Sequence, residues 1–555
     1  MENHKMTPWQ RLVGLLQLEK RDILQIFYYA IFSGVVALSL PLGIQAIINL
    51  IQGAQISTSW VILVILVTIG VAFSGSLQIM QLRIIETIQQ RIFMRSSFEL
   101  AYRFPKIKMA ELRNYYLPEL ANRFFDTLTI QKSLSKILID VPTALLQILF
   151  ALILLSFYHP FFIIFGLLLL ILVFIVFKFT AKKGLDTSLK ESKNKYKVAH
   201  WIQEIGRSVI SFKLSGSTSL GVDKNDYLVS NYLKARESHF KVLMLQFIQM
   251  IGFKVVVTAS LLLIGGALVL NQEMNIGQFV AAEIIILLVI ASVEKLILGL
   301  ESFYDALTSL EKIGQIVDKE LESQEGETSQ FSKGIHIELD EVGYEVNDRD
   351  KPILKDISFS INPKSRILIV GESGSGKSTL LRLISGVIEA TSGHLYVNDM
   401  SINSLHLNFY RSQLGMSLSD ETPFEGTIRD NLNFGNTNIT DEQIFEVLEK
   451  TGLKTFVKEQ REGLNTILYP DGKQMSYTLS KKIVLARAIL KQPKLLILED
   501  ALDRFNETET NAIIDYLTHP DRPWALIVVS SSKAWVNKCS EVITLQKGQI
   551  KNLNS

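Results

Sequence analysis

Six long apolar runs, all within the first 300 residues, constrain this chain more than any other feature. A helix of about 20 apolar residues spans a hydrocarbon core about 30 Å thick. Ordinary soluble cores do not need so many long runs with so few charges. We therefore predict an all-α six-helix transmembrane domain over residues 1–317, with a kink at Pro41. The predicted spans cover about residues 23–51, 60–80, 141–157, 161–177, 242–270 and 279–300.

The loops between these runs differ sharply in charge. The short loops at 53–57, 158–160 and 271–275 contain no Lys or Arg, whereas the long stretches at 83–136 and 178–241 contain many. Positively charged loops stay on the cytoplasmic side of a membrane. We therefore expect a multi-pass protein of the inner (plasma) membrane, with the lipid bilayer as its surroundings. Both termini and both long loops are expected in the cytosol, and no secretory leader is expected.

The composition changes after the last apolar run. Residues 318–333 are rich in Glu, Ser, Gln and Gly, which predicts a linker. Strand-like and helical segments then alternate over 334–555, which predicts an α/β domain. The single cysteine, Cys539, rules out a disulfide within the chain and a cysteine-based metal cluster. A net charge of +2 gives no reason to expect a nucleic-acid partner.

One segment of this second domain fits the phosphate-loop pattern G-x-x-x-x-G-K-[ST]. An apolar run at 367–370 precedes it and a helix-like run at 380–384 follows it, as the motif requires. Its glycines let backbone N–H groups point at an anion, and the next helix adds its positive end. The Lys is expected to reach the β- and γ-phosphates, and the Ser hydroxyl to face Mg²⁺. The candidate binding residues are Gly371, Glu372, Ser373, Gly374, Ser375, Gly376, Lys377, Ser378 and Thr379.

With these motifs in hand, the chain resembles the ATP-binding cassette (ABC) exporters over nearly its whole length. The order of six spans, linker and one α/β P-loop nucleotide-binding domain is similar to a half-transporter of that family. The resemblance implies ATP and Mg²⁺ as cofactors and a dimer as the working unit. The segments that carry it, besides the phosphate loop, are Pro352–Phe359, Glu425–Leu432, Leu485–Leu490, Lys494–Asp500 and Gln546–Ile550.

Several positions depart from the family pattern. Where the family signature reads Leu-Ser-Gly-Gly-Gln, this chain has Met475, Ser476, Tyr477, Thr478 and Leu479. Ser419 stands in place of the glutamine that senses Mg²⁺, and Ser531 in place of the switch histidine. The acidic pair reads Glu499 then Asp500, where the family has Asp then Glu. The adenine-stacking aromatic falls on Val346, with Tyr344 two residues earlier.

These departures affect cleavage more than binding. Glu499 can still face Mg²⁺ together with Ser378, but Asp500 is one methylene short as a general base. A misplacement of about 1 Å can cost about 100-fold in rate, and general-base catalysis contributes about 10²–10⁴-fold. Backbone N–H groups and Lys377, which grip the nucleotide, are intact. We therefore expect ATP binding with slow or absent hydrolysis; an activity that is merely reduced is the alternative.

Two functions remain open at this point. The first is an ABC exporter subunit, type I secretion-like, that moves a polypeptide, or else a lipid or drug, out of the cytosol. The second is a non-hydrolytic ATP-binding subunit that regulates or scaffolds a larger assembly. The expected partner is a second copy, or another ABC half-transporter in a heterodimer, with a membrane-fusion adaptor if a polypeptide is secreted. The resemblance places coupling to the nucleotide-binding domains in Phe104–Phe125 and His200–Thr218.

Overall fold

The computed structural model describes residues 6–328, 331, 334–346 and 348–554, apart from 53–57. The chain divides into two compact units. The first comprises Met1–Ile107 and Asn114–Glu320, and the second comprises Lys108–Arg113 and Leu321–Ser555. The predicted loop at 53–57 and residues 329–330 and 332–333 of the predicted linker lie outside the described residues.

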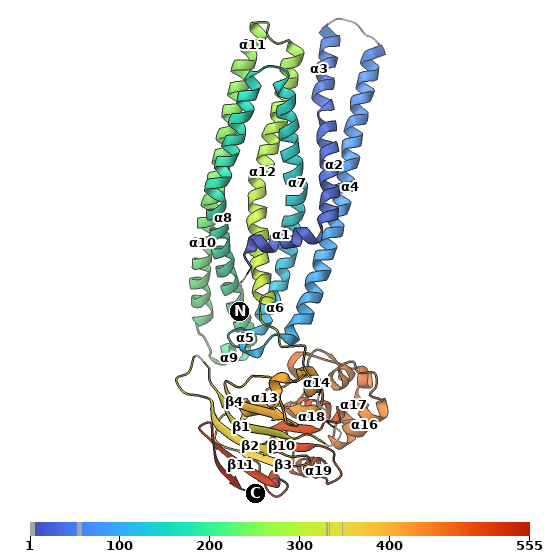
Figure 1. Ribbon diagram of the computed structural model, residues 1–555, viewed down its shortest axis with the longest axis vertical. Coiled ribbons are helices and arrows are strands. Elements are labelled where there is room, and N and C mark those ends of the chain that lie inside the picture. The colour runs from blue at the N-terminus through green and yellow to red at the C-terminus, as the bar shows by residue number, and fades with distance from the viewer. Residues whose placement is uncertain (1–5, 53–57, 329–330, 332–333, 347, 555) are drawn as a thin grey trace. The chain divides into compact units, whose positions relative to one another are not determined.

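The first unit is built of helices, as predicted (Figure 1). Six helical stretches in the described part of the chain are long and apolar enough to cross a membrane, and the predicted spans fall on them. They are Lys20–Gln52, Thr58–Lys106, Leu117–Ser156, Phe161–Arg207, Leu220–Leu270 and Ile276–Val317. The helices of this unit are α1 (Pro8–Leu18), α2 (Lys20–Ala37), α3 (Ser39–Gln52), α4 (Thr58–Arg103), α6 (Leu117–Asn122), α7 (Asp126–Ser156), α8 (Phe161–Arg207), α9 (Val209–Leu214), α10 (Leu220–Ser260), α11 (Gly266–Leu270) and α12 (Ile276–Val317).

The predicted kink has a local cause. Proline lacks the N–H for an i→i−4 bond, and its ring clashes with the carbonyl four residues earlier. For Pro41 that carbonyl belongs to Ala37, the last residue of α2, and α3 begins at Ser39. The interruption therefore falls at Leu38, and the two helices together form one span.

Helix α12 carries the core of the first unit. Many of its side chains are buried, and its neighbour in the core is α7. The N-terminal helix α1 runs across the long helices (Figure 1). Trp9 of α1 stacks on Phe303 with 6.1 Å between ring centroids, and Arg11 pairs with Asp318 at the end of α12. These contacts fix α1 to the last turns of α12.

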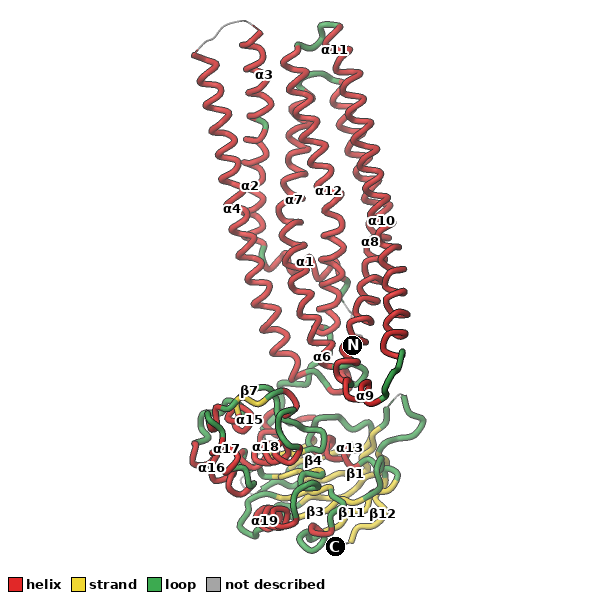
Figure 2. Tube along the Cα trace, turned by 180° about the vertical axis from the view of Figure 1, so that it is seen from behind, coloured by secondary structure: helices red, strands yellow, loops and turns green. Residues whose placement is uncertain are grey.

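The described part of the second unit contains two large sheets of different kinds and a small two-stranded antiparallel sheet of β7 and β8; strands are yellow in Figure 2. Four strands form a sheet in the order β2-β1-β4-β5, whose described pairs are antiparallel. In the other sheet the order is β12-β11-β3-β10-β9-β6, and β11, β3, β10, β9 and β6 are parallel. The strands are β1 (Ile337–Tyr344), β2 (Leu354–Ile361), β3 (Arg366–Val370), β4 (Ser392–Val397), β5 (Met400–Ser401), β6 (Leu414–Ser417), β7 (Gly426–Thr427), β8 (Ile467–Leu468), β9 (Leu495–Glu499), β10 (Ala525–Val529), β11 (Glu541–Gln546) and β12 (Gln549–Asn554).

Helices cover both faces of the parallel sheet, so its central strands are apolar on both sides. Alternate residues of β9 pack into two cores: Ile497 on the face of α13 (Lys377–Ile384), and Leu496 and Leu498 on the face of α18 (Tyr477–Leu490). The predicted α/β character is confirmed. The remaining helices of this unit are α5 (Met109–Leu112), α14 (Leu407–Ser412), α15 (Ile428–Asn433), α16 (Asp441–Lys450), α17 (Lys454–Glu459) and α19 (Glu507–Leu517).

Two segments at the start of the second unit pack against its main body. The segment Lys108–Arg113 contributes an ion pair from Lys108 to Glu389, 3.3 Å long. In the described part of the predicted linker, Glu322 pairs with Arg411 at 2.6 Å. Phe331 is buried in the core next to the four-stranded sheet.

The sheet core leads to a stability prediction. Ile369 in β3 is fully buried, so Ile369→Ala should lower the free energy of unfolding by about 2–5 kcal/mol. Ile467 in β8 is 61% exposed, and Ile467→Ala should change it by less than about 0.5 kcal/mol. Denaturant unfolding of the full-length protein in detergent measures both. Equal effects would contradict the assignment of β3 to the core.

Candidate functional site

Four neighbouring parallel strands bring the predicted site residues to one edge of the sheet. β3 ends at Val370, immediately before the phosphate loop, and β9 ends at Glu499. Ser531 follows β10 by two residues, and Ser419 follows β6 by two residues. Because β3, β10, β9 and β6 are parallel and adjacent in that order, their carboxyl ends meet. Ligands of α/β proteins bind at such an edge.

The phosphate loop needs glycine at its turn into α13. Gly376 has φ +101° and caps the helix in the left-handed region. A Cβ there would lie 2.7 Å from Cδ2 of Leu354 and 3.0 Å from the carbonyl oxygen of Ile353. Only glycine therefore allows the loop to close against β2 and place the first N–H groups of α13 beside it.

The loop contains a cation and a buried hydroxyl without a partner. Nζ of Lys377 donates to the carbonyl oxygens of Gly371 (2.7 Å) and Glu372 (2.8 Å). Oγ of Ser375 is buried and has no hydrogen-bond partner among the described residues. A loop with a cation, a helix N-terminus and an unsatisfied hydroxyl fits the phosphates of a nucleotide.

The carboxylate of Glu499, at the end of β9, accepts hydrogen bonds from the start of α13 and from the loop after β6. Oγ of Ser378 donates to its Oε1. The hydroxyl and backbone N–H of Ser419 both donate to its Oε2, at 3.0 Å and 3.3 Å. Glu499 is only 3% exposed, so these bonds satisfy a buried carboxylate. A carboxylate beside a serine hydroxyl suits Mg²⁺, which prefers oxygen ligands.

Asp500 adopts an unusual backbone conformation directly after β9. Its φ is +47°, a region that costs energy for a non-glycine residue. Its N–H donates to the carbonyl oxygen of Val529 at 2.9 Å, which ties this turn to β10. Burial, the charge and hydrogen bond of Asp503, and the charge of Glu499 together raise the pKa of Asp500 to about 6. A carboxyl with that pKa is suited to general-base work near neutral pH.

Asp503, in the turn after β9, and Ser530, directly after β10, were not predicted from the sequence. Oγ of Ser530 donates to Oδ1 of Asp503 at 3.3 Å, and Ser530 is buried. The side chain of Ser531, the predicted site residue, is exposed. The recurrence of an acidic residue three positions after Asp500 was the available signal. The two adjacent serines after β10 could not be distinguished from sequence.

The altered signature segment is held within its own subunit. Ser476 caps α18, and its hydroxyl accepts from the N–H of Leu479 at 3.2 Å. The guanidinium of Arg504 lies 4.5 Å from the ring centroid of Tyr477, and Oγ1 of Thr478 donates to the carbonyl oxygen of Arg504 at 3.4 Å. The side chain of Met475 packs against the core under α18.

A buried lysine that sequence reasoning passed over lies one turn into α18. Lys481 is 2% exposed, and burial lowers its pKa. Its Nζ donates to three carbonyl oxygens of the loop after β6: Leu418 (3.0 Å), Ser419 (2.7 Å) and Glu421 (2.9 Å). These contacts depend on the path of that loop, which a sequence pattern does not reveal.

The two predicted adenine contacts lie at and beyond the end of β1. Tyr344 is its last residue and is half-buried against the core. Val346 is 9% exposed, so little of its side chain is available to a ligand. The assignment of Tyr344 and Val346 as adenine contacts therefore stays a prediction.

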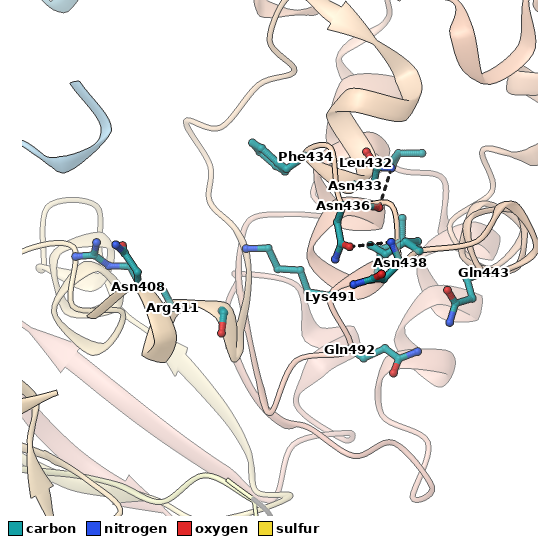
Figure 3. A pocket seen from close by; sticks show the side chains of 13 residues that line it. Asn408, Arg411, Leu432, Asn433, Phe434, Asn436, Asn438, Gln443, Lys491 and Gln492 are labelled. Carbon is teal, nitrogen blue, oxygen red and sulfur yellow. Dashed lines mark hydrogen bonds between the residues drawn. The ribbon is translucent and has the colours of Figure 1, made fainter. Parts of the chain in front are cut away.

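A separate groove of about 620 Å³ lies among α14, α15 and the end of α18 (Figure 3). Its lining is rich in amides, and Figure 3 shows Lys491 with Asn408 and Arg411 on one side and Asn436 and Asn438 on the other. Nδ2 of Asn433 donates to the carbonyl oxygen of Asn436 at 3.2 Å, which shapes one wall. Phe434, also in the lining, is 60% exposed. The groove combines polar groups with one large exposed aromatic ring.

Comparison with known proteins gives consistent matches for both units. Residues 23–293 match the family model for the ABC transporter transmembrane region, and residues 354–503 match that for the ABC transporter domain. The toxin RTX-I translocation ATP-binding protein of Actinobacillus pleuropneumoniae is 29% identical over 55% of this chain and 42% of its own length. The alpha-hemolysin translocation ATP-binding protein HlyB of Escherichia coli is 26% identical over 56% and 44%. The ATP-dependent lipid A-core flippase of Coxiella burnetii is 27% identical over 49% and 47%.

These three matches each span less than half of the relative's length. A solved structure of a bacterial Atm1-family ABC exporter with ATP bound aligns with a TM-score of 0.84, over 97% of this chain and 95% of that one. At 16% identity that likeness shows the fold. The two family models, the six apolar helices and the phosphate-loop domain agree: the chain belongs to the ABC transporters.

Proposed function

We propose that this protein is an ABC exporter subunit that binds ATP with Mg²⁺ at the candidate site and works as a dimer in a membrane. The observation that carries the proposal is the Glu499 carboxylate hydrogen-bonded to Ser378, next to a loop that holds Lys377 and the Ser375 hydroxyl, which has no hydrogen-bond partner among the described residues. Phosphate-loop proteins use this set of groups for a nucleoside triphosphate.

Each group has a distinct task in that proposal. The N–H groups of the phosphate loop and the Lys377 ammonium bind the β- and γ-phosphates, and Lys377 exchanges its two carbonyl contacts for them. Ser378 and Glu499 hold Mg²⁺, which supplies positive charge to the phosphate oxygens. Asp500 accepts the proton of the attacking water when its carboxylate is ionised.

The geometry supports slow cleavage. Asp500 is short, and its backbone is fixed in the left-handed region by Val529. Both donors of Ser419 are committed to Glu499, so this residue does not extend toward an attacking water as a longer side chain would. An oriented base misplaced by about 1 Å loses about 100-fold in rate. We propose that ATP is held firmly and hydrolysed slowly.

The relatives guide the proposal on substrate and partners. Two of them carry names that refer to translocation of a toxin and a hemolysin, and a third is named a lipid A-core flippase. We propose export from the cytosol, with a polypeptide as the first substrate class to test and a lipid as the second. The dimer is formed with a second copy or another ABC half-transporter, and a membrane-fusion adaptor would accompany polypeptide secretion. The inner membrane, with both termini in the cytosol, is the proposed location.

We propose that short cytosolic helices transmit movement between the units. The segment Lys108–Arg113, from the first long extension, groups with the second unit, which supports a coupling role for it. The second extension carries α9, whose Ile210 and Leu214 are 69% and 82% exposed.

The alternative is a non-hydrolytic subunit that regulates or scaffolds an assembly through ATP binding. The contacts of Tyr477 and Thr478 with Arg504 favour it, because the two residues that stand in place of the signature glycines contact a residue of their own subunit. Steady-state phosphate release from the purified protein in lipid separates the two functions. Turnover that Asp500→Asn abolishes would exclude the alternative.

The binding site is tested by Lys377→Ala. Loss of the loop cation should weaken ATP affinity by at least about tenfold, because a charge-assisted contact to phosphate is lost. Equilibrium binding of a fluorescent ATP analogue to the protein in lipid nanodiscs measures the change. Lys364→Ala, at an exposed surface position, should leave affinity unaltered. Unchanged affinity in Lys377→Ala would contradict the proposed site.

The pKa of Asp500 predicts how residual turnover depends on pH. A general base works ionised, so turnover should fall as the pH drops through about 6. Asp503→Asn removes a negative neighbour, lowers the pKa of Asp500 and should move that fall to lower pH. Asp521→Asn, at an 88% exposed side chain, serves as the control. The measurement is phosphate release between pH 5 and 8. If Asp503→Asn leaves the pH midpoint of turnover unchanged, Asp500 is not the general base.

A further inference from the structure

Lys481 is a charged side chain in a buried position, where burial costs free energy unless polar partners compensate it. It is among the largest fully buried side chains of the described residues, yet its ammonium pairs with carbonyl oxygens rather than a carboxylate. A lysine has three N–H donors, and here each meets a carbonyl of residues 418–421. The ammonium group therefore holds three carbonyl groups of one short loop against α18.

That loop is the one that holds the Glu499 carboxylate. The carbonyl oxygen of Ser419 accepts a hydrogen bond from Nζ of Lys481. The N–H and the hydroxyl of Ser419 both donate to the Glu499 carboxylate. Glu499 in turn accepts from Ser378 at the start of α13. A continuous series of hydrogen bonds thus runs from α18, through the loop and the carboxylate, to α13 (Figure 1 labels both helices).

We infer that Lys481 is a positioning residue for the Mg²⁺ of bound ATP: it fixes the 418–421 loop so that Ser419 orients the Glu499 carboxylate beside Ser378. The inference rests on the proposed function, because it assigns a task within that same site. Residues that orient a metal ligand typically change metal affinity when they are altered, without touching the metal. Lys481 has that relation to Glu499, with Ser419 between them.

The neighbouring lysine provides a matched control. Lys482 lies one residue further along α18 and is also buried, but it pairs with Glu509 at 2.9 Å and contacts the carbonyl oxygen of Gly452 at 3.5 Å. Among the described residues, its ion pair and hydrogen bonds do not reach the 418–421 loop, and its carboxylate partner is on α19. Replacing Lys482 therefore perturbs the same helix and removes the same charge without releasing Ser419.

The test uses the full-length protein in lipid nanodiscs and measures ATP affinity twice, with Mg²⁺ and with EDTA. Lys481→Met should reduce the gain in affinity that Mg²⁺ provides by about tenfold. Affinity in EDTA should remain as in the wild type, since the phosphate loop and Lys377 are intact. Lys481→Gln keeps two donors and should fall between Met and Lys. Lys482→Met should match the wild type in both buffers.

A double variant tests whether Lys481 acts through Ser419. Ser419→Ala removes one donor to Glu499 and should lower the gain from Mg²⁺. Adding Lys481→Met to Ser419→Ala should give less than the product of the two separate effects, because both act on one contact. Effects that simply multiply would overturn the inference.

Two further outcomes separate the inference from the proposed function. If Lys481→Met and Lys481→Gln keep the full gain from Mg²⁺, or lose affinity equally in EDTA, the positioning role is wrong while the nucleotide site stands. If the wild type binds no ATP in either buffer, the proposed function fails and the inference with it.

Discussion

The contacts of the Glu499 carboxylate are the interaction on which the rest of the site depends. A buried carboxylate requires hydrogen-bond donors, and here they come from two separate segments: Ser378 at the start of α13 and Ser419 after β6. The parallel order of β3, β10, β9 and β6 makes this meeting possible, because it places all their carboxyl ends on one edge. The glycines of the phosphate loop then allow α13 to start close to β9.

Much of this arrangement was predictable from local patterns. The run Leu495–Leu498 is apolar at every position, which indicates a strand covered on both faces, and an acidic residue at its end falls at the ligand edge. The phosphate loop is predicted by the spacing of its motif together with the apolar run before it and the helix-like run after it. The six apolar runs likewise predicted the spans, since few other structures accommodate such lengths.

What escaped prediction depends on how loops fold back. No sequence motif marks Lys481, and only the path of residues 418–421 gives it three carbonyl partners. The contact of Tyr477 with Arg504 joins residues 27 positions apart through the turn after β9. Asp503 and Ser530 belong to the same turn and to the end of β10, and their pairing has no periodic signal. Tertiary packing, which no sequence window contains, decided each of these.

The extent of α8 has a mechanical consequence. Its apolar run ends near residue 177, yet the helix continues without interruption from Phe161 to Arg207, 47 residues in all. At 1.5 Å per residue this is a rod about 70 Å long, of which a bilayer core covers only about 30 Å. A rigid rod that pivots inside the bilayer works as a lever arm. A tilt of about 5° swings a tip about 40 Å from the pivot by about 3–4 Å. Small rearrangements among lipid-embedded side chains are thereby magnified where the rod ends in water.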